Sequence, residues 1–593
     1  MAVGVREYVE AALGKRPLTL LIRGAKLVNV NTGEIYPASI GSYGDRIVYV
    51  GPGGRAPPAE DVIDARGAYA LPGFIDTHLH VESTMLTPAR FAEAVIPHGT
   101  TTAFADPHEI ANVLGKDGVR MMVENAKGLP MKLYFLAPTC VPESPAVTSG
   151  AEISPADVAE MVSWEGVAGL GEVMDFDAVL AMTPKMEEIL EIGRRLGLLI
   201  DGHSPLLSGR ELSGYMAAGP DSDHENFTVE SMLEKLRAGM YVKLRPPYVA
   251  NTRKFVAALK ELPTPWNVIM VTDDVMPDNL ERLGHLDYNC RSFIEAGMDP
   301  IEAIRSCTLR PAQHVRMPQL GALSPGKAAD VVLVDNLKRL RVQAVVSDGV
   351  LVARGGKMLS RWAPRPFGRR ALDTMKTGTL GPDDFVVKPP VADGALTVNA
   401  IDFGLVRSPK DPAEAFMESV LTTLTRAEVR AEGGLLKLDD LAVVLVFDRH
   451  RGVKRRSFGF ARNLMKRGAI ASSAAHDGHN LVVMGKDQRD MQAAAEMVTR
   501  GKGGIAAVDS KPLAFVDLPV AGLMSEEGLG EVSKKMRGLR SAFKKMGVID
   551  HPYMPVVALL TLSVIPHARI TDKGVYDVDG RRFVEPFIPG ENP

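Results

Sequence analysis

Cysteine is scarce in this chain. Cys140, Cys290 and Cys307 are the only ones among 593 residues, and no two of them form a Cys-x-x-Cys pair. A zinc site built from cysteines is therefore excluded, because such sites need several thiolates close together. The scarcity suits a reducing cytoplasm, and we expect the protein to be cytoplasmic.

An excess of charge and a long apolar run are also missing. Lys and Arg number 69 against 72 for Asp and Glu, a net charge of -3, so we expect no nucleic-acid or membrane partner. The longest apolar stretch, Val556 to Ile565, is too short to cross a bilayer and is predicted to be a buried strand. The first eight residues lack the apolar segment of a signal peptide, and we expect none.

What the sequence does contain is an apolar run that ends in two histidines. The run from Leu71 to His80 reads as a strand, in which side chains two apart point to the same side, so His78 and His80 converge. Two imidazoles held in this way are a typical metal-ligand pair. A His-x-His occurs by chance in about one chain of this length in three, so the interpretation needs support from the rest of the chain.

Seven further segments share this design, an apolar run that ends in polar, ligand-type residues. They are 101–109, 133–139, 167–172, 198–203, 221–226, 240–245 and 268–274. Stretches that read as helices, such as Pro184 to Leu196, lie between most of them. Eight strands alternating with helices predict an α/β fold with a (β/α)8, TIM-like barrel, in which catalytic groups gather at the carboxyl ends of the strands.

The flanking segments indicate further domains. Short β-type runs before and after the barrel predict one small split β-sandwich from residues 1–72 and 317–365, with the catalytic barrel at 73–316. Residues 360–390 are rich in Pro, Gly, Arg and Lys and read as a linker. An additional C-terminal α/β (α+β) domain is predicted at 391–593.

The motifs, taken in order, resemble the amidohydrolase superfamily and, within it, the bacterial and archaeal adenine deaminases. The matching segments are 72–83, 106–112, 169–174, 201–205, 222–225 and 272–274 in the barrel, with 468–473 and 475–480 in the C-terminal region. The resemblance covers nearly the whole chain. It implies a metal-dependent hydrolase.

The resemblance implies a site with two divalent ions. His78 and His80 would bind one ion, His203 and His224 the other, Glu172 would bridge them and Asp273 would complete the first ion's shell. The residues agree with this, because two cations close together need an anionic bridge. Imidazoles and carboxylates suit Mn(II), Fe(II) or Zn(II), and the resemblance favours Mn or Fe.

The implied reaction converts adenine to hypoxanthine and ammonia, a step of purine salvage. A metal-activated hydroxide would attack C6 of adenine, and Asp273 would relay its proton to the leaving amine. His108, Glu109 and Glu225 are candidate catalytic and substrate-binding residues, because each follows a strand and one of them must meet the ring nitrogens. A carboxylate that accepts the ring N–H of a free base predicts that adenosine and AMP are poor substrates. We also expect a homo-oligomer, a dimer or larger.

Several alternatives stay open. Asp274 competes with Asp273, which strand alternation and the family pattern favour. His108 and Glu109 could instead cap the helix after Pro107. The His476, Asp477 and His479 cluster could hold a ligand or be a solvated loop, and glycines 501, 503 and 504 read as a loop rather than a phosphate site. The same ligands would also serve another heterocyclic amine or a cyclic amide. A non-enzymatic binding relative is disfavoured, because it has no need of six ligands.

Overall fold

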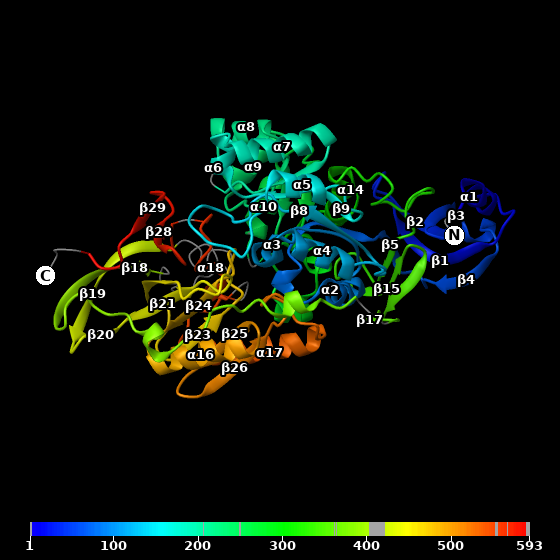
Figure 1. Ribbon diagram of the computed structural model, residues 1–593. Helices are drawn as coiled ribbons and strands as arrows, with labels where there is room; N and C mark the ends of the chain where they lie inside the picture. The colour runs from blue at the N-terminus through cyan, green and yellow to red at the C-terminus, as the bar shows by residue number, and fades with distance from the viewer. Residues whose placement is uncertain are drawn as a thin grey trace.

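The computed structural model describes residues 3–205, 207–247, 249, 251–360, 362, 365–402, 422–551, 555–565 and 567–588. Figure 1 shows a central barrel, with a β-sheet beside the N-terminus on one flank and a yellow-to-orange C-terminal region on the other. No helix among the described residues is long and apolar enough to cross a membrane.

The barrel consists of eight parallel strands, as the sequence predicts. They are β6 (Phe74–Leu79), β7 (Thr100–Ala105), β8 (Lys132–Ala137), β9 (Val167–Val173), β10 (Leu199–Gly202), β11 (Ser222–Asp223), β12 (Tyr241–Leu244) and β13 (Val268–Met270). Strands β6 to β10 form one parallel sheet and β11 to β13 a second, and a parallel bridge between Leu79 and Asp273 brings the last strand back to the first. The carboxyl ends of all eight strands therefore meet at one mouth.

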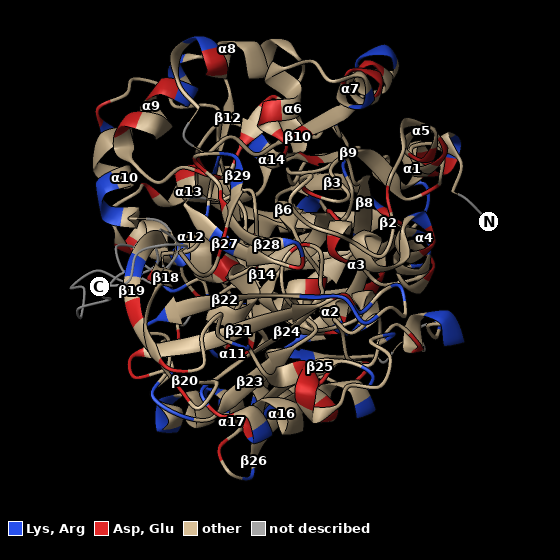
Figure 2. Cartoon of the chain, turned by 60° about the vertical axis from the view of Figure 1, so that its left-hand side comes forward, with Lys and Arg blue, Asp and Glu red and all other residues tan. Residues whose placement is uncertain are grey.

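Amphipathic helices cover the outside of the barrel. Helix α7 (Pro184–Leu196) has the predicted bounds: Pro184 occupies its first turn and Gly197, at φ 63°, ends it in the left-handed conformation that glycine favours. Met186, Ile189 and Leu190 are buried on its inner face. Lys, Arg, Asp and Glu lie on the outer side, and Figure 2 shows both signs of charge on α7, α8 (Gly209–Ala217) and α9 (Val229–Arg237).

A nine-stranded sheet contains strands from both flanks of the barrel. Its strands are β1 (Leu18–Val28), β2 (Ile35–Tyr43), β3 (Arg46–Gly51), β4 (Ala59–Asp64), β5 (Tyr69–Pro72), β14 (Val331–Val334), β15 (Val342–Ser347), β16 (Val350–Arg354) and β17 (Lys357–Met358). Antiparallel pairing of β5 with β14 joins the two flanks. Because β5 leads directly into β6, this sheet anchors the strand that presents the two histidines.

The C-terminal region has its own nine-stranded sheet. Its strands are β18 (Gly394–Asp402), β19 (Thr423–Glu432), β20 (Leu435–Lys437), β21 (Leu441–Phe447), β22 (Arg456–Arg462), β23 (Ala469–Ser472), β24 (Leu481–Gly485), β25 (Gly504–Val508) and β26 (Pro512–Asp517). Helices α16 (Gln488–Arg500) and α17 (Leu529–Met546) pack against β25 and β26. A small sheet of β27 (Ala568–Thr571), β28 (Gly574–Asp577) and β29 (Arg582–Val584) comes after it in the chain.

Polar contacts hold the C-terminal region against the barrel. Arg540 of α17 donates to Asp278 of α11 (Pro277–Leu283) at 2.6 Å. Asn480, between β23 and β24, donates to the Thr148 carbonyl at 2.7 Å. These contacts place the loop that connects β23 to β24, residues 473–480, beside the barrel mouth.

The apolar stretch from Val556 to Ile565 is not the strand that its composition predicts. It begins with the short helix α18 (Val556–Leu559), and the residues after the helix form turns. Pro555 is the N-cap residue of this helix, and a short apolar run is compatible with a helix as well as with a strand. The glycine-rich segment after α16 is a loop at Gly501 and Gly503, as predicted, whereas Gly504 begins β25. A Cβ on Gly503 would lie 2.3 Å from the Gly522 Cα, so close backbone packing requires glycine there.

Candidate metal centre and substrate pocket

Six buried side chains converge at the barrel mouth from five strands or the residues directly after them. His78 lies on β6 and Glu172 on β9, whereas the other four lie just beyond a strand end: His80, His203, His224 and Asp273. Side-chain alternation along β6 places His78 and His80 in contact, with ring centroids 5.1 Å apart. The sequence-predicted ligand residues are therefore brought together.

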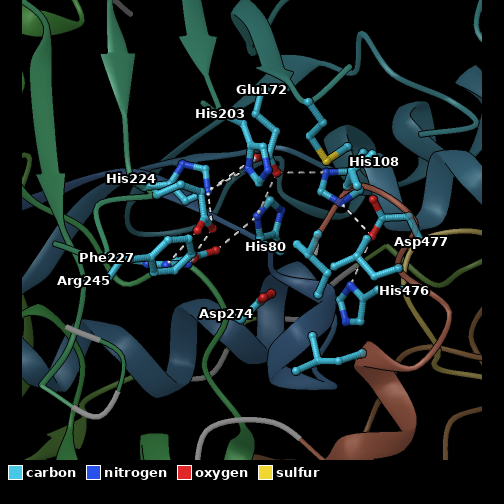
Figure 3. Close-up of a pocket in the computed structure, with 17 residues that line it drawn as sticks. His80, His108, Glu172, His203, His224, Phe227, Arg245, Asp274, His476 and Asp477 are labelled. Carbon is cyan, nitrogen blue, oxygen red and sulfur yellow. Dashed lines mark hydrogen bonds and ion pairs between the residues drawn. The ribbon is translucent and has the colours of Figure 1, made fainter. Parts of the chain in front are cut away.

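Glu172 lies at the centre of this group (Figure 3). Its Oε1 is 3.3 Å from His80 Nε2, and its Oε2 is 3.2 Å from His203 Nδ1 and 3.5 Å from His224 Nε2. Burial alone would raise the pKa of Glu172, but the hydrogen bond from His203 and the other histidines hold it well below the ordinary value. The carboxylate is therefore anionic and faces histidines from both halves of the barrel.

Asp273, rather than Asp274, lies against the first two histidines. Its Oδ1 is 3.6 Å from His78 Nε2 and 3.4 Å from His80 Nε2. Its Oδ2 accepts a hydrogen bond from Arg245 Nη1 at 2.8 Å. Asp274 also faces the pocket, and its carboxylate accepts from Ser83.

The donor set fits divalent metal ions. Two groups, His78–His80–Glu172 and Glu172–His203–His224, each have ligand atoms within 4.8 Å of one another. Ligands bound tetrahedrally at about 2.0–2.2 Å from one ion lie about 3.3–3.6 Å apart, which is close to the separations around Glu172 and Asp273. Among the described residues, His78 Nε2 is buried and has no hydrogen-bond partner. An inward-facing lone pair of this kind suits a cation.

Buried polar partners fix the rings of the first two histidines. His78 Nδ1 lies 2.7 Å from Asp201 Oδ2, and Lys243 Nζ lies 2.5 Å from Asp201 Oδ1, with all three side chains fully buried. His80 Nδ1 lies 3.1 Å from the Asp106 carbonyl oxygen. Each Nδ1 can thus donate its proton outward, which leaves Nε2 as the ligand atom. Burial would raise the pKa of Asp201, but Lys243 and His78 hold it well below the ordinary value.

A pocket opens directly above these groups. Its apolar wall combines barrel residues with residues of the C-terminal region: Met174, Phe227, Leu559, Leu562, Val564 and Ile565. Its polar lining includes Glu225, Arg245, His108 and Asp477. The arrangement suits a flat ring with a polar edge, because apolar side chains face its planes and charged groups meet its rim.

His108 and Glu225 lie where the sequence analysis expects them, in the pocket. His108, in the first turn of α3 (His108–Leu114), has Nδ1 3.5 Å from Glu172 Oε1 and Nε2 3.6 Å from Asp477 Oδ1. Both Glu225 oxygens accept from Arg245, at 2.8 and 3.1 Å. Burial raises the pKa of Glu225, and the Arg245 charge opposes that rise.

Glu109 is not among the described residues that line this pocket. Its Oε1 accepts from Ser83 Oγ at 2.7 Å, and its Oε2 lies 3.7 Å from His479 Nε2. The helical position of Glu109, one residue beyond His108, turns the carboxylate toward the C-terminal loop. This position does not support the direct substrate contact that the sequence analysis expects.

Sequence reasoning missed one buried ion pair around the site and left open whether the loop at Asp477 is buried. Asp201 and Lys243 have no assigned role in the sequence analysis, although charged residues inside apolar strands are a detectable signal of a buried ion pair. Asp477 and its neighbours are buried in the structure rather than solvated. Nothing local in the sequence indicates this, because the loop becomes buried only when two distant regions meet.

An eight-stranded barrel whose strand ends gather four histidines and two carboxylates is the architecture of the amidohydrolases. The amidohydrolase family model matches residues 69–352, and the adenine deaminase C-terminal domain model matches residues 419–582. An adenine deaminase from Moorella thermoacetica is 38% identical over 97% of this chain and 97% of its own, and one from Klebsiella pneumoniae is 37% identical over 98% and 96%. A solved adenosine deaminase from Xanthomonas campestris with bound zinc has a TM-score of 0.45 and 14% identity, over 58% of this chain and 95% of that chain. The chain belongs to the adenine deaminase family.

Proposed function

We propose that this protein hydrolyses adenine to hypoxanthine and ammonia, as in purine salvage, in the pocket above Glu172. The observation that carries the proposal is the convergence of six metal-ligand side chains beneath a pocket with apolar walls and a charged rim. Relatives named adenine deaminase match nearly the full length of the chain, which supports adenine as the substrate.

We propose two divalent ions, Mn or Fe with Zn as an alternative. His78, His80 and Asp273 would hold one, His203 and His224 the other, and Glu172 lies between the two groups. Bound divalent ions lower the pKa of water and so supply a nucleophile near neutral pH. The anionic state of Glu172, which lies between the two histidine pairs, supports two cations here.

Asp273 would move the proton. Its carboxylate borders both the histidine pair and the pocket, so it can accept a proton from the attacking water and return it to the leaving amine. Arg245, which donates to Asp273 Oδ2 at 2.8 Å, fixes the orientation of the carboxylate. The same guanidinium holds Glu225, so one cation positions two carboxylates at the pocket rim.

His108 and Glu225 would meet the substrate ring. His108 faces the pocket between Glu172 and Asp477, so it can donate to a ring nitrogen where negative charge develops. Glu225 would accept the ring N–H of a free base. Glu109 would act as a positioning residue, through Ser83 and Asp274, because Ser83 lies between the two carboxylates.

The test is ammonia release from adenine, adenosine, AMP and guanine at equal concentrations, with metal-loaded protein. We expect adenine to be preferred, because a ribose at the N–H position would remove the hydrogen bond from the ring to the charged Glu225, which is worth about 1.5–3 kcal/mol. Comparable kcat/KM for adenine and adenosine would contradict the pocket assignment, and no release from adenine would contradict the function. We further expect a cytoplasmic homo-oligomer, which light scattering and cell fractionation test.

A further inference from the structure

A second group of metal-ligand side chains lies beside the pocket wall. Glu109, His476 and His479 have ligand atoms that all lie within 4.8 Å of one another. Glu109 comes from α3 of the barrel, whereas both histidines come from the loop at residues 473–480. The group therefore spans the contact between the barrel and the C-terminal region, and none of its members belongs to the six ligands described above.

The three side chains face one another without forming hydrogen bonds. Glu109 Oε2 is 3.7 Å from His479 Nε2, and Glu109 Oε1 is 3.9 Å from His476 Nδ1. Both separations exceed the usual hydrogen-bond range. They are a few tenths of an ångström longer than the edge of about 3.3–3.6 Å between ligands of one tetrahedral ion. The geometry is thus nearer to that of two ligands around a cation than to that of a direct bond.

The buried ring of His479 lacks hydrogen-bond partners in the described part of the chain, which indicates a cation site. Its side chain is fully buried, and neither ring nitrogen has a hydrogen-bond partner among the described residues. A buried imidazole normally has partners, since burying an unpaired polar atom is costly. A cation between Glu109 and His479 would give Nε2 a partner.

Neighbouring charges also favour a cation here. Asp477 Oδ1 lies 3.3 Å from His476 Nδ1, and Ser83 links Glu109 to Asp274. Glu109, Asp274 and Asp477 thus place three carboxylates near the two imidazoles. The buried Arg449 contacts His479 through the His479 carbonyl oxygen rather than through the ring. Figure 3 shows His476 and Asp477 on one side of the pocket, away from His203 and His224.

We propose that Glu109, His476 and His479 bind a third divalent cation, separate from the two-ion centre at Glu172. Two imidazoles and one carboxylate suit Zn(II), Mn(II) or Fe(II). The ion would tie α3 to the C-terminal loop and so hold Asp477 beside His108. The metal content of this site can be measured without substrate, so its test does not depend on the proposed reaction.

The test is the metal content of the full-length chain. Stripped protein is reloaded with excess Mn(II) or, separately, Zn(II), freed of unbound metal and measured by elemental mass spectrometry. We expect the wild type to hold one ion per chain more than His479→Asn and Glu109→Gln. His551→Gln, which changes another buried histidine of the C-terminal region, should match the wild type.

A second variant separates this site from the two-ion centre. Glu172→Gln should lose ions from the barrel yet keep the one held by His479, and the double variant Glu172→Gln/His479→Asn should lose that one too. Circular dichroism and gel filtration check that each variant folds. Equal metal content in folded wild type and His479→Asn overturns the proposal. If His479→Asn does not fold, a wild type that saturates at two ions overturns it equally. Ammonia release from adenine reports separately on the proposed function.

Discussion

Replacing Lys243 with Met should weaken metal binding from outside the ligand set. Lys243 Nζ pairs with Asp201 Oδ1 at 2.5 Å, and Asp201 Oδ2 holds His78 Nδ1 at 2.7 Å. The substitution keeps the apolar stem of the side chain and removes its charge. Asp201 is then left buried without its counter-ion, and it retains hydrogen bonds from Ser222 Oγ and the Gly202 N–H.

The substitution should change both the free energy of unfolding and the metal affinity. Removing one partner of a buried ion pair costs about 3–5 kcal/mol, and the hydrogen bonds that Asp201 keeps place the expected loss near the lower end. A domain whose stability is about 5–15 kcal/mol tolerates that loss. Burial then raises the pKa of Asp201, so it holds His78 less firmly. Mutating the residue that bonds a ligand histidine lowers metal affinity by about 10–100-fold, and because Asp201 itself remains we expect the lower end of that range.

Lys235 provides a matched control. It is also fully buried and pairs with Asp223 Oδ2 at 2.7 Å, but Asp223 accepts from Ser204 rather than from a metal-ligand histidine. Lys235→Met should lose similar stability in denaturant unfolding of the metal-free chain. Lys235 also donates to the carbonyl oxygens of Ser204 and Glu225, next to two ligand histidines, but it holds no ligand ring through a carboxylate. The metal affinity of Lys235→Met, measured in competition with a chromophoric chelator, should therefore fall clearly less than that of Lys243→Met. If the two variants lose metal affinity equally, Asp201 does not orient His78, and the reasoning fails.

Two other predictions concern the acidic pair and a buried histidine. Asp273→Asn should retain much of the metal but lose most of the rate of ammonia release, and Asp274→Asn should lose less of that rate. A larger loss of rate in Asp274→Asn than in Asp273→Asn would assign the proton transfer to Asp274. Burial lowers the pKa of His285 from 6.5 to about 3. Below pH 6.5 the unfolded chain therefore binds a proton that the folded chain does not, so the free energy of unfolding decreases as the pH is lowered. Between pH 7 and 5 this residue should cost the wild type about 2 kcal/mol, at about 1.36 kcal/mol per pH unit below 6.5. His285→Gln should therefore lose that much less in denaturant unfolding, and an equal fall in both proteins would show that His285 is not held neutral.

The barrel and the convergence of its ligands could be predicted because both depend on local patterns. Strand alternation places His78 and His80 on one side, and the parallel rule brings every strand's carboxyl end to one mouth. Even the two-residue strand at Ser222–Asp223 fits that rhythm. The ligand positions are therefore a consequence of short-range order repeated eight times.

The surroundings of the ligands could not be predicted in this way. Glu109 comes directly after His108, and the sequence gives no sign that one side chain enters the pocket while the next turns toward His479. A helical step of about 100° separates them, and only the packing of the C-terminal loop decides what the second one meets. The sequence prediction of a strand at Val556–Ile565 is wrong for a related reason, since a short apolar run does not distinguish a strand from a helix such as α18.

The pocket itself depends on both regions of the chain. The barrel supplies Glu172 and the charged rim, but Leu559, Leu562, Val564 and Ile565 come from residues that lie beyond the barrel by more than two hundred positions. Without them the strand ends would face water, where charges attract and orient a substrate far more weakly than in an enclosed site. Asp477, which reaches His108 from the same side, adds a charge that the barrel alone does not place there. The C-terminal region therefore forms one wall of the pocket. Substitutions in that wall should change the preference for the substrate ring as strongly as substitutions in the barrel do.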